Sequence, residues 1–211
     1  EYGSGKSQVA HQLCVNVQLP IERGGSNGGA LYIDTENTFR TERIVQMARH
    51  LGMDPDEVVK NIIIAEAYTS DHQMFLLENS DSIIKDNNIR LIIVDSLTAH
   101  FRSEYLGRES LALRQQKLNK HMHKLIRLAR AFNAVAFVTN QVMASPDVFF
   151  GDAIRPVGGH VVGHTSHTRV FLRKSAHGPV RIARLVSSPY LPEGERTFKI
   201  TENGIEDVEE E

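Results

Sequence analysis

The chain has 211 residues, which is the length of one large domain or two small ones, and 41% of them are hydrophobic, enough for a buried core. It contains no apolar run of membrane-spanning length, no visible signal peptide and only one cysteine, Cys14, so we expect a cytoplasmic protein without a disulfide framework or a membrane partner. The net charge of −2 implies that any surface for nucleic acid is local. The ten histidines show no metal-site pattern, and His121 and His123 are expected to have packing or solvated roles.

The first residues carry a phosphate-binding pattern. Gly3-Ser4-Gly5-Lys6-Ser7 matches the second half of G-x-x-x-x-G-K-[ST], in which glycines let several N–H groups point at one anion. Lys6 is expected to reach the β- and γ-phosphates of ATP, and the Ser7 hydroxyl to bind Mg²⁺. The motif's first glycine and the strand before it would precede Glu1, so we expect the chain to begin within a longer one. The alternative is a glycine turn beside a surface lysine.

Strands and helices are expected to alternate after this loop. A first helix spans Gln8 to Val17 and ends before Pro20, and a Gly-rich turn covers Glu22 to Gly29. Apolar runs predict strands at Ala30–Asp34, Ile62–Ala65, Leu91–Asp95 and Val135–Thr139. Helical spacing predicts helices at Thr38–Leu51, at Ser70 to about Asp86 with Ser70 as its cap, and at Glu109–Phe132. This alternation predicts an α/β fold with a mainly parallel sheet covered on both faces.

The pattern changes near the C-terminus. Val142 to Val157 lacks periodicity and is predicted to be a long loop, which in a compact domain is usually functional. Short runs at Arg169–Lys174, Val180–Val186 and Thr197–Ile200 predict antiparallel strands that extend the sheet. The acidic tail from Glu206 to Glu211 is expected to fray. With no repeat and no linker, we count a single domain over residues 1–211.

Asp95 and Glu36 are the acidic candidates at strand ends. Asp95 ends an apolar strand, as does the Walker B acid that holds Mg²⁺ in phosphate-loop proteins; the alternative is a local cap. Glu36 follows the predicted strand Ala30–Asp34 at the edge where a parallel sheet binds its ligands. It is therefore a candidate general base for a water near the γ-phosphate, and capping the helix near Thr38 is an equally good reading.

Gln141 follows the fourth predicted strand, in the sequence Thr139-Asn140-Gln141. A neutral amide at this position can hydrogen-bond a γ-phosphate and respond to its loss. Since the predicted long loop begins at the next residue, nucleotide state and loop are expected to be coupled.

Two segments are candidates for DNA contact. The predicted loop from Phe101 to Arg108 carries Arg102, Tyr105 and Arg108, a mixture of basic and aromatic residues that suits a nucleic-acid backbone; the alternative is an ordinary solvated helix entry. Gly158-Gly159 opens a further helix, whose free N–H groups would receive a DNA phosphate. Arg155 is the only cation of the long loop.

Eight motifs in order resemble the archaeal RadA recombinases, members of the RecA-like strand-exchange ATPase family. They are Gly3 to Gln8, Tyr32 to Glu36, Phe39 to Arg43, Ile93 to Ser96, Glu104 to Arg108, Ala112 to Lys117, Thr139 to Val142 and Val157 to His160. The resemblance covers the chain from its first residue to about Asp207. It is far more specific than any single motif.

The resemblance implies a RecA-like P-loop ATPase core that uses ATP and Mg²⁺, forms filaments on single-stranded DNA, pairs it with double-stranded DNA and exchanges strands. By motif position, Glu36 corresponds to the catalytic glutamate, Gln141 to the γ-phosphate sensor and Arg43 to the arginine against adenine, while Gln8 extends the nucleotide site. Arg102 to Arg108 resembles the first DNA-binding loop and Val142 to Val157 the second. Pro189 to Glu193 resembles the cap over ATP of the neighbouring subunit.

Three residues depart from the family pattern: Asn37 stands where many members have Gly, Ser187 where an Asp often precedes the cap, and Ser145 where some archaeal members have a basic residue. The alternative function is a regulatory paralogue that binds ATP and a recombinase without exchanging strands. A small-molecule kinase is a third possibility, but the sequence offers no acceptor pocket or lid.

Overall fold

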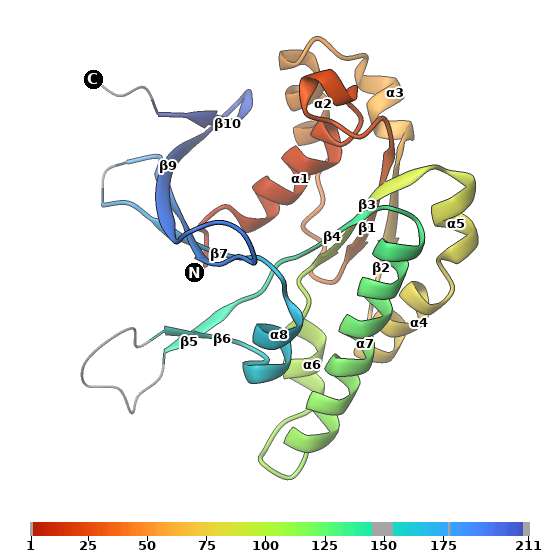
Figure 1. Cartoon of the computed structure of the whole chain (residues 1–211), viewed down its shortest axis with the longest axis vertical. Coiled ribbons are helices and arrows are strands. Elements are labelled where there is room, and N and C mark those ends of the chain that lie inside the picture. The colour runs from red at the N-terminus through yellow and green to blue at the C-terminus, as the bar shows by residue number, and fades with distance from the viewer. Residues whose placement is uncertain (1, 145–153, 177, 209–211) are drawn as a thin grey trace.

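The structure is a computed structural model that describes residues 2–144, 154–176 and 178–208 (Figure 1). Its helices are α1 (Lys6–Asn16), a short 3-10 turn (Ile21–Arg23), α2 (Thr41–His50), α3 (Pro55–Lys60), α4 (Ser70–Glu78), α5 (Asp81–Asp86), α6 (Ala99–Glu104), α7 (Leu111–Ala131) and α8 (Gly159–Thr165). Its strands are β1 (Gly29–Asp34), β2 (Ile62–Glu66), β3 (Ile89–Asp95), β4 (Val135–Val138), β5 (Val142–Ala144), β6 (Ile154–Pro156), β7 (Arg169–Lys174), β8 (Val180–Ser187), β9 (Gly194–Thr201) and β10 (Gly204–Asp207).

Four parallel strands form the central sheet, in the order β2-β1-β3-β4. All six residues of β1 are buried, which explains why its sequence is apolar throughout rather than alternating. The register aligns Asp34 at the end of β1 with Asp95 at the end of β3. The two carboxylates therefore leave the sheet side by side at its carboxyl edge. The predicted α/β fold and parallel sheet are confirmed.

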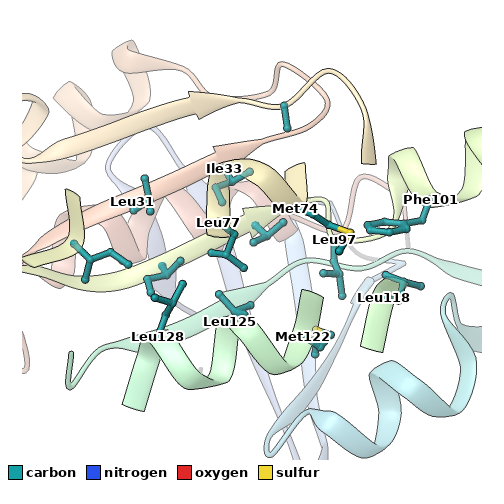
Figure 2. Packing of buried hydrophobic residues seen from close by; sticks show 14 of the residues in the cluster. Leu31, Ile33, Met74, Leu77, Leu97, Phe101, Leu118, Met122, Leu125 and Leu128 are labelled. Carbon is teal, nitrogen blue, oxygen red and sulfur yellow. The ribbon is translucent and has the colours of Figure 1, made fainter. Parts of the chain in front are cut away.

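Helices pack on both faces of this sheet and enclose two hydrophobic cores. Alternate residues of β1 face opposite sides: Leu31 and Ile33 contact α4 and α7, whereas Ala30 and Tyr32 contact α1 and α2. Figure 2 shows the first core, where Leu118, Met122, Leu125 and Leu128 of α7 pack beneath the strands. The covered faces hold the strand ends, and the residues that follow them, in fixed positions.

The C-terminal strands form a second sheet of their own, in the antiparallel order β10-β9-β8-β7 (Figure 1). The prediction that they extend the parallel sheet is therefore wrong within the described residues. Hydrogen bonds to side chains of α1 and α2, the helices that cover one face of the first sheet, hold the second sheet in place instead of a strand ladder. The Ile205 amide donates to Gln12 of α1 at 3.0 Å, and Arg43 of α2 donates to the carbonyl of Thr201 at 3.0 Å.

Several helix boundaries differ from the sequence prediction. The single helix expected from Ser70 to about Asp86 is two, because the chain breaks at Asn79 and Ser80. Thr69, not Ser70, is the cap, and its hydroxyl accepts from the His72 amide at 3.0 Å. α3 was not predicted, although Asp54 caps it and proline follows directly. α6 occupies the first half of the segment predicted to be a loop from Phe101 to Arg108.

The segment from Val142 to Val157 is not a loop throughout. Its ends, β5 and β6, pair in antiparallel fashion, with Val142 opposite Pro156 and Ala144 opposite Ile154. Ser145, which departs from the family pattern, lies outside the described residues. At the C-terminus, Glu206 and Asp207 belong to β10, so the expected fraying does not begin at Glu206. Across the described ranges, no helix combines the length and the apolar character needed to cross a membrane.

Candidate nucleotide and DNA site

The phosphate loop has the backbone geometry that its glycines predict. Gly3 and Gly5 have φ of 67° and 100°, the left-handed region that favours glycine. α1 begins at Lys6, and the Gly5 N-cap provides no side chain to its N–H groups. Ser4 is buried. The first turn of an eleven-residue helix thus presents backbone donors and its positive dipole end at the loop.

The antiparallel sheet lies directly over the phosphate loop. A Cβ at Gly5 would stand 2.6 Å from Ile200 Cδ1 of β9, so only glycine fits there without a shift. A Cβ at Gly3 would stand 2.9 Å from the Lys174 ammonium of β7. Lys174 therefore places a second cation, in addition to Lys6, beside the phosphate loop. Nothing in the local sequence around Lys174 identified it, because it reaches the loop through the packing of two distant segments.

Asp95 is the centre of a buried hydroxyl network. Its Oδ2 accepts from the Tyr32 hydroxyl at 2.5 Å and the Thr38 hydroxyl at 3.2 Å, and its Oδ1 accepts from the Thr139 hydroxyl. Burial, followed by the charge of Asp95, raises the pKa of Tyr32, which keeps the phenol protonated as a donor. Asp95 is thus fixed by residues from three segments, and the alternative reading of a simple local cap is not supported.

Asp34 organises the turn that carries Glu36. Its carboxylate accepts from the amides of Glu36 at 3.2 Å, Thr38 at 3.2 Å and Phe39 at 2.9 Å. These bonds keep the backbone in a non-helical turn up to Arg40, and α2 therefore begins at Thr41 rather than at Thr38. Within this turn Asn37 has φ of 53°, a left-handed conformation that asparagine tolerates better than most residues.

Glu36 is not a helix cap, because the N-cap of α2 is Arg40 and no side chain caps it. Desolvation, reinforced by the charge of Asp95, raises the pKa of Glu36 above its ordinary value, while Lys6 acts in the opposite direction. A carboxylate whose pKa is raised is a stronger base. The charges of Lys6 and Asp95 both influence the pKa of Glu36, so Glu36 lies within electrostatic range of the phosphate loop and of the strand-end acid.

Gln141 joins the candidate base to Phe101–Arg108, the first candidate DNA segment. Its Nε2 donates to Glu36 Oε1 at 3.5 Å, and its Oε1 accepts from the Arg102 guanidinium at 2.8 Å. The backbone around it is held by Asn140, whose Oδ1 accepts from the Gln141 amide at 2.9 Å and whose Nδ2 donates to the Val157 carbonyl at 2.6 Å. Sequence reasoning named Asn140 only as part of a motif and missed this anchoring role.

The residues of the first candidate DNA segment have different surroundings. Arg108 is exposed, whereas Arg102 is half-buried and contacts Gln141. Tyr105 is also half-buried: its ring packs on Phe101, with a centroid separation of 6.5 Å, and the Lys117 ammonium lies 5.2 Å from its centroid. Tyr105 is therefore already engaged in packing, and its contact with DNA stays a prediction.

Gly158-Gly159, the other candidate for DNA contact, lies beside the start of α6. Gly158 is the N-cap of α8 with φ of 90°, so its expected place before Gly159 at a helix start is confirmed. A Cβ at Gly158 would approach Val162 to 2.5 Å and Thr98, the N-cap of α6, to 3.6 Å. The backbone of Arg155 pairs with Met143. The starts of the two candidate DNA helices therefore lie together, next to Gln141.

Arg43 uses its donors within the protein. Its Nε donates to Gln8 at 2.9 Å, and its terminal nitrogens donate to the carbonyls of Thr201 and Glu202, each at 3.0 Å. The guanidinium therefore ties α1 and α2 to the turn between β9 and β10. Stacking of its planar face against adenine remains a prediction.

The donor set suits Mg²⁺ only together with phosphates. Among the described residues, no group of three or more His, Cys, Asp or Glu side chains is arranged to hold a metal. Ser7 and Asp95 would supply oxygen ligands, and Mg²⁺ is commonly held by one or two protein oxygens, substrate phosphates and water. The residues present fit such an ion.

Comparisons with known proteins agree with this architecture. The sequence model of the Rad51 family matches residues 1–208. A curated relative, the DNA repair and recombination protein RadA of Aeropyrum pernix, is 57% identical over 209 residues, which cover 99% of this chain and 65% of the relative. The chain thus spans about two thirds of the length of this relative.

Proposed function

The chain belongs to the Rad51 family, and from this premise we propose that it is the ATPase core of a recombinase. In this proposal it binds ATP with Mg²⁺, hydrolyses ATP in a DNA-dependent manner, and assembles with further copies into a filament on single-stranded DNA. The filament pairs with homologous double-stranded DNA and exchanges strands. The observation that carries the proposal is the contact of Gln141 with both Glu36 and Arg102, because it links the nucleotide side of the site to the DNA side.

Each residue has a distinct role in this mechanism. The backbone N–H groups of the phosphate loop and Lys6 bind the phosphates, and Ser7 and Asp95 hold Mg²⁺, which would neutralise phosphate charge when bound. Glu36 takes the proton from the attacking water, with its pKa raised by desolvation. Asp34 holds the turn that orients Glu36. Lys174 adds a second positive charge next to Gly3.

The proposed DNA contacts involve Arg102, Arg108, Arg155 and the N–H groups at Gly158 and Gly159. Arg102 and Gly158 support a common DNA surface, since α6 and α8 begin side by side. A regulatory paralogue has less support, because three hydrogen bonds to Asp34 hold the turn that carries Glu36 and the side-chain amide of Gln141 contacts this glutamate. Nothing in the described part of the chain favours a small-molecule acceptor.

The decisive experiment measures ATP hydrolysis by the full-length protein with and without a poly-dT oligonucleotide. We expect single-stranded DNA to stimulate hydrolysis, and Lys6→Ala to abolish it through loss of nucleotide binding. A matched control is Lys60→Ala, since Lys60 lies on the exposed side of α3 in an ion pair with Glu57. If the parent protein hydrolyses ATP at the same rate with and without DNA, the recombinase proposal is refuted.

A further inference from the structure

Gln141 lies between two partners that both constrain its amide. Arg102 of α6 donates to its oxygen at 2.8 Å, while its nitrogen donates to Glu36 at 3.5 Å. Arginine has only donors, and an ionised carboxylate has only acceptors. Both contacts therefore require the same orientation of the amide. If the amide turned over, it would place nitrogen against guanidinium and oxygen against carboxylate, which are both repulsive.

Only the side chain of Gln141 is free to respond, because its backbone is held on both sides. The backbone N–H of Gln141 donates to Asn140 Oδ1 at 2.9 Å, and its backbone carbonyl accepts from the Val157 backbone N–H at 2.9 Å. Asn140 is in turn held by the Thr98 hydroxyl at 2.8 Å. Since Thr98 is the N-cap of α6, the backbone of Gln141 and the helix of Arg102 form one hydrogen-bonded unit.

The contact also affects the candidate base. A hydrogen bond donated to a carboxylate stabilises its charged form, which opposes the desolvation that raises the pKa of Glu36. It also occupies an oxygen that would otherwise accept the proton of water. An amide nitrogen engaged with Glu36 is, moreover, not engaged with a phosphate. Arg102 therefore favours a state in which base and sensor are bound to each other.

We propose that Arg102 is a positioning residue that holds Gln141 against Glu36, and that a phosphate of single-stranded DNA releases both by taking the Arg102 guanidinium. The bond from Arg102 to a neutral amide is weaker than a charge-assisted pair with a phosphate. Arg102 is half-buried rather than enclosed, so a phosphate can reach it. The inference rests on the proposed function and adds a route by which the DNA segment at α6 controls hydrolysis.

The first test needs no nucleotide. If Gln141 competes with DNA for Arg102, then Gln141→Met, which keeps the side chain's length but removes its acceptor, should strengthen poly-dT binding by nucleotide-free protein roughly three- to tenfold. The same substitution should change nothing in an Arg102→Ala background. A merely structural role of Gln141 would weaken binding in both backgrounds. Arg102→Met replaces Arg102→Ala in this cycle if the alanine variant is unstable.

The second test measures hydrolysis without DNA. Arg102→Ala should raise the DNA-free rate several-fold and reduce the ratio of stimulated to basal rate, with little change in KM for ATP. Arg102→Lys keeps a donor and should restore the low basal rate. Arg127→Ala, which removes an exposed arginine of α7, serves as a control and should leave the ratio unchanged.

The outcomes separate the two proposals. If the parent protein neither binds poly-dT nor shows DNA-stimulated hydrolysis, the proposed function fails, and the role of Arg102 fails with it. If the parent shows both activities but Gln141→Met does not tighten nucleotide-free binding, or tightens it equally without Arg102, only the role of Arg102 is overturned. A DNA-free rate that stays constant or falls in Arg102→Ala has the same meaning.

Discussion

His121 should make the fold sensitive to acid. It lies on α7 with 1% of its surface exposed, packs against Phe101, and contacts Gln73 Nε2 through its own Nε2 at 3.1 Å. Burial lowers the pKa of His121 from 6.5 to about 4. Since the Gln73 amide nitrogen also donates to the Leu97 carbonyl, at 3.0 Å, His121 Nε2 is the acceptor of that contact. Protonation of His121 Nε2 would place its N–H against the N–H of the Gln73 amide, so that two donors face each other.

The sign and size of the effect follow from this pKa. Between pH 6.5 and 4 the unfolded chain binds a proton at His121 and the native protein does not, so stability falls as the pH is lowered through this window. A shift from 6.5 to about 4, at about 1.36 kcal/mol per pH unit, corresponds to ~3 kcal/mol. This is a large share of a typical unfolding free energy of about 5–15 kcal/mol.

The assay is urea unfolding of the parent and of His121→Leu at several pH values. The variant lacks the contact with Gln73, so its unfolding free energy at pH 7 should be about 1 kcal/mol lower than that of the parent. Between pH 6.5 and 4, however, the unfolding free energy of the parent should fall by ~3 kcal/mol more than that of the variant. His123→Leu, two residues along on the exposed side of α7, should keep the pH dependence of the parent. If His121→Leu also keeps it, then His121 is not the neutral buried group described.

Three further predictions concern the candidate site. Glu36→Gln should keep ATP binding but slow hydrolysis by roughly 10²–10⁴-fold in a steady-state assay, the usual contribution of a positioned base; normal turnover would exclude Glu36. Gln141→Ala should leave ATP affinity nearly unchanged and remove the effect of a non-hydrolysable ATP analogue on single-stranded DNA affinity; an unchanged ratio would show that it is not the sensor. Asp34→Ala leaves three backbone amides without their acceptor and should lower the unfolding free energy by roughly 2–4 kcal/mol, whereas Asp71→Ala, at an exposed ion pair, should cost less than about 1 kcal/mol.

Local patterns predicted the parallel part of the fold well. Four apolar runs gave the four strands of the central sheet, and the helical spacing of α7 gave its buried face, because both periodicities reflect burial directly. The glycines of the phosphate loop and the acid at the end of β3 were also recognisable, since their chemistry depends on nearby residues in sequence. These signals need no knowledge of distant contacts.

Tertiary contacts explain what the sequence did not reveal. Asp34 resembles any strand-end acid until its three amide partners are seen, and those bonds delay α2 by one turn. Lys174 reaches Gly3 from another sheet, and Arg102 turns toward Gln141 instead of solvent. The antiparallel strands could be recognised individually, but hydrophobic alternation does not tell which sheet they join.

The hydroxyl network around Asp95 has a consequence for folding as well as for chemistry. β1 is buried on both faces, so sliding it past β3 by one residue would exchange one apolar surface for another and meet little hydrophobic penalty. The bond from Tyr32 to Asp95 and the pairing of Thr35 with Ser96 exist in one alignment only. Asp95, a candidate metal ligand, thus also helps to select the correct strand alignment. Replacement of Asp95 by an apolar residue is therefore expected to reduce the yield of correctly folded protein, even where no nucleotide is bound.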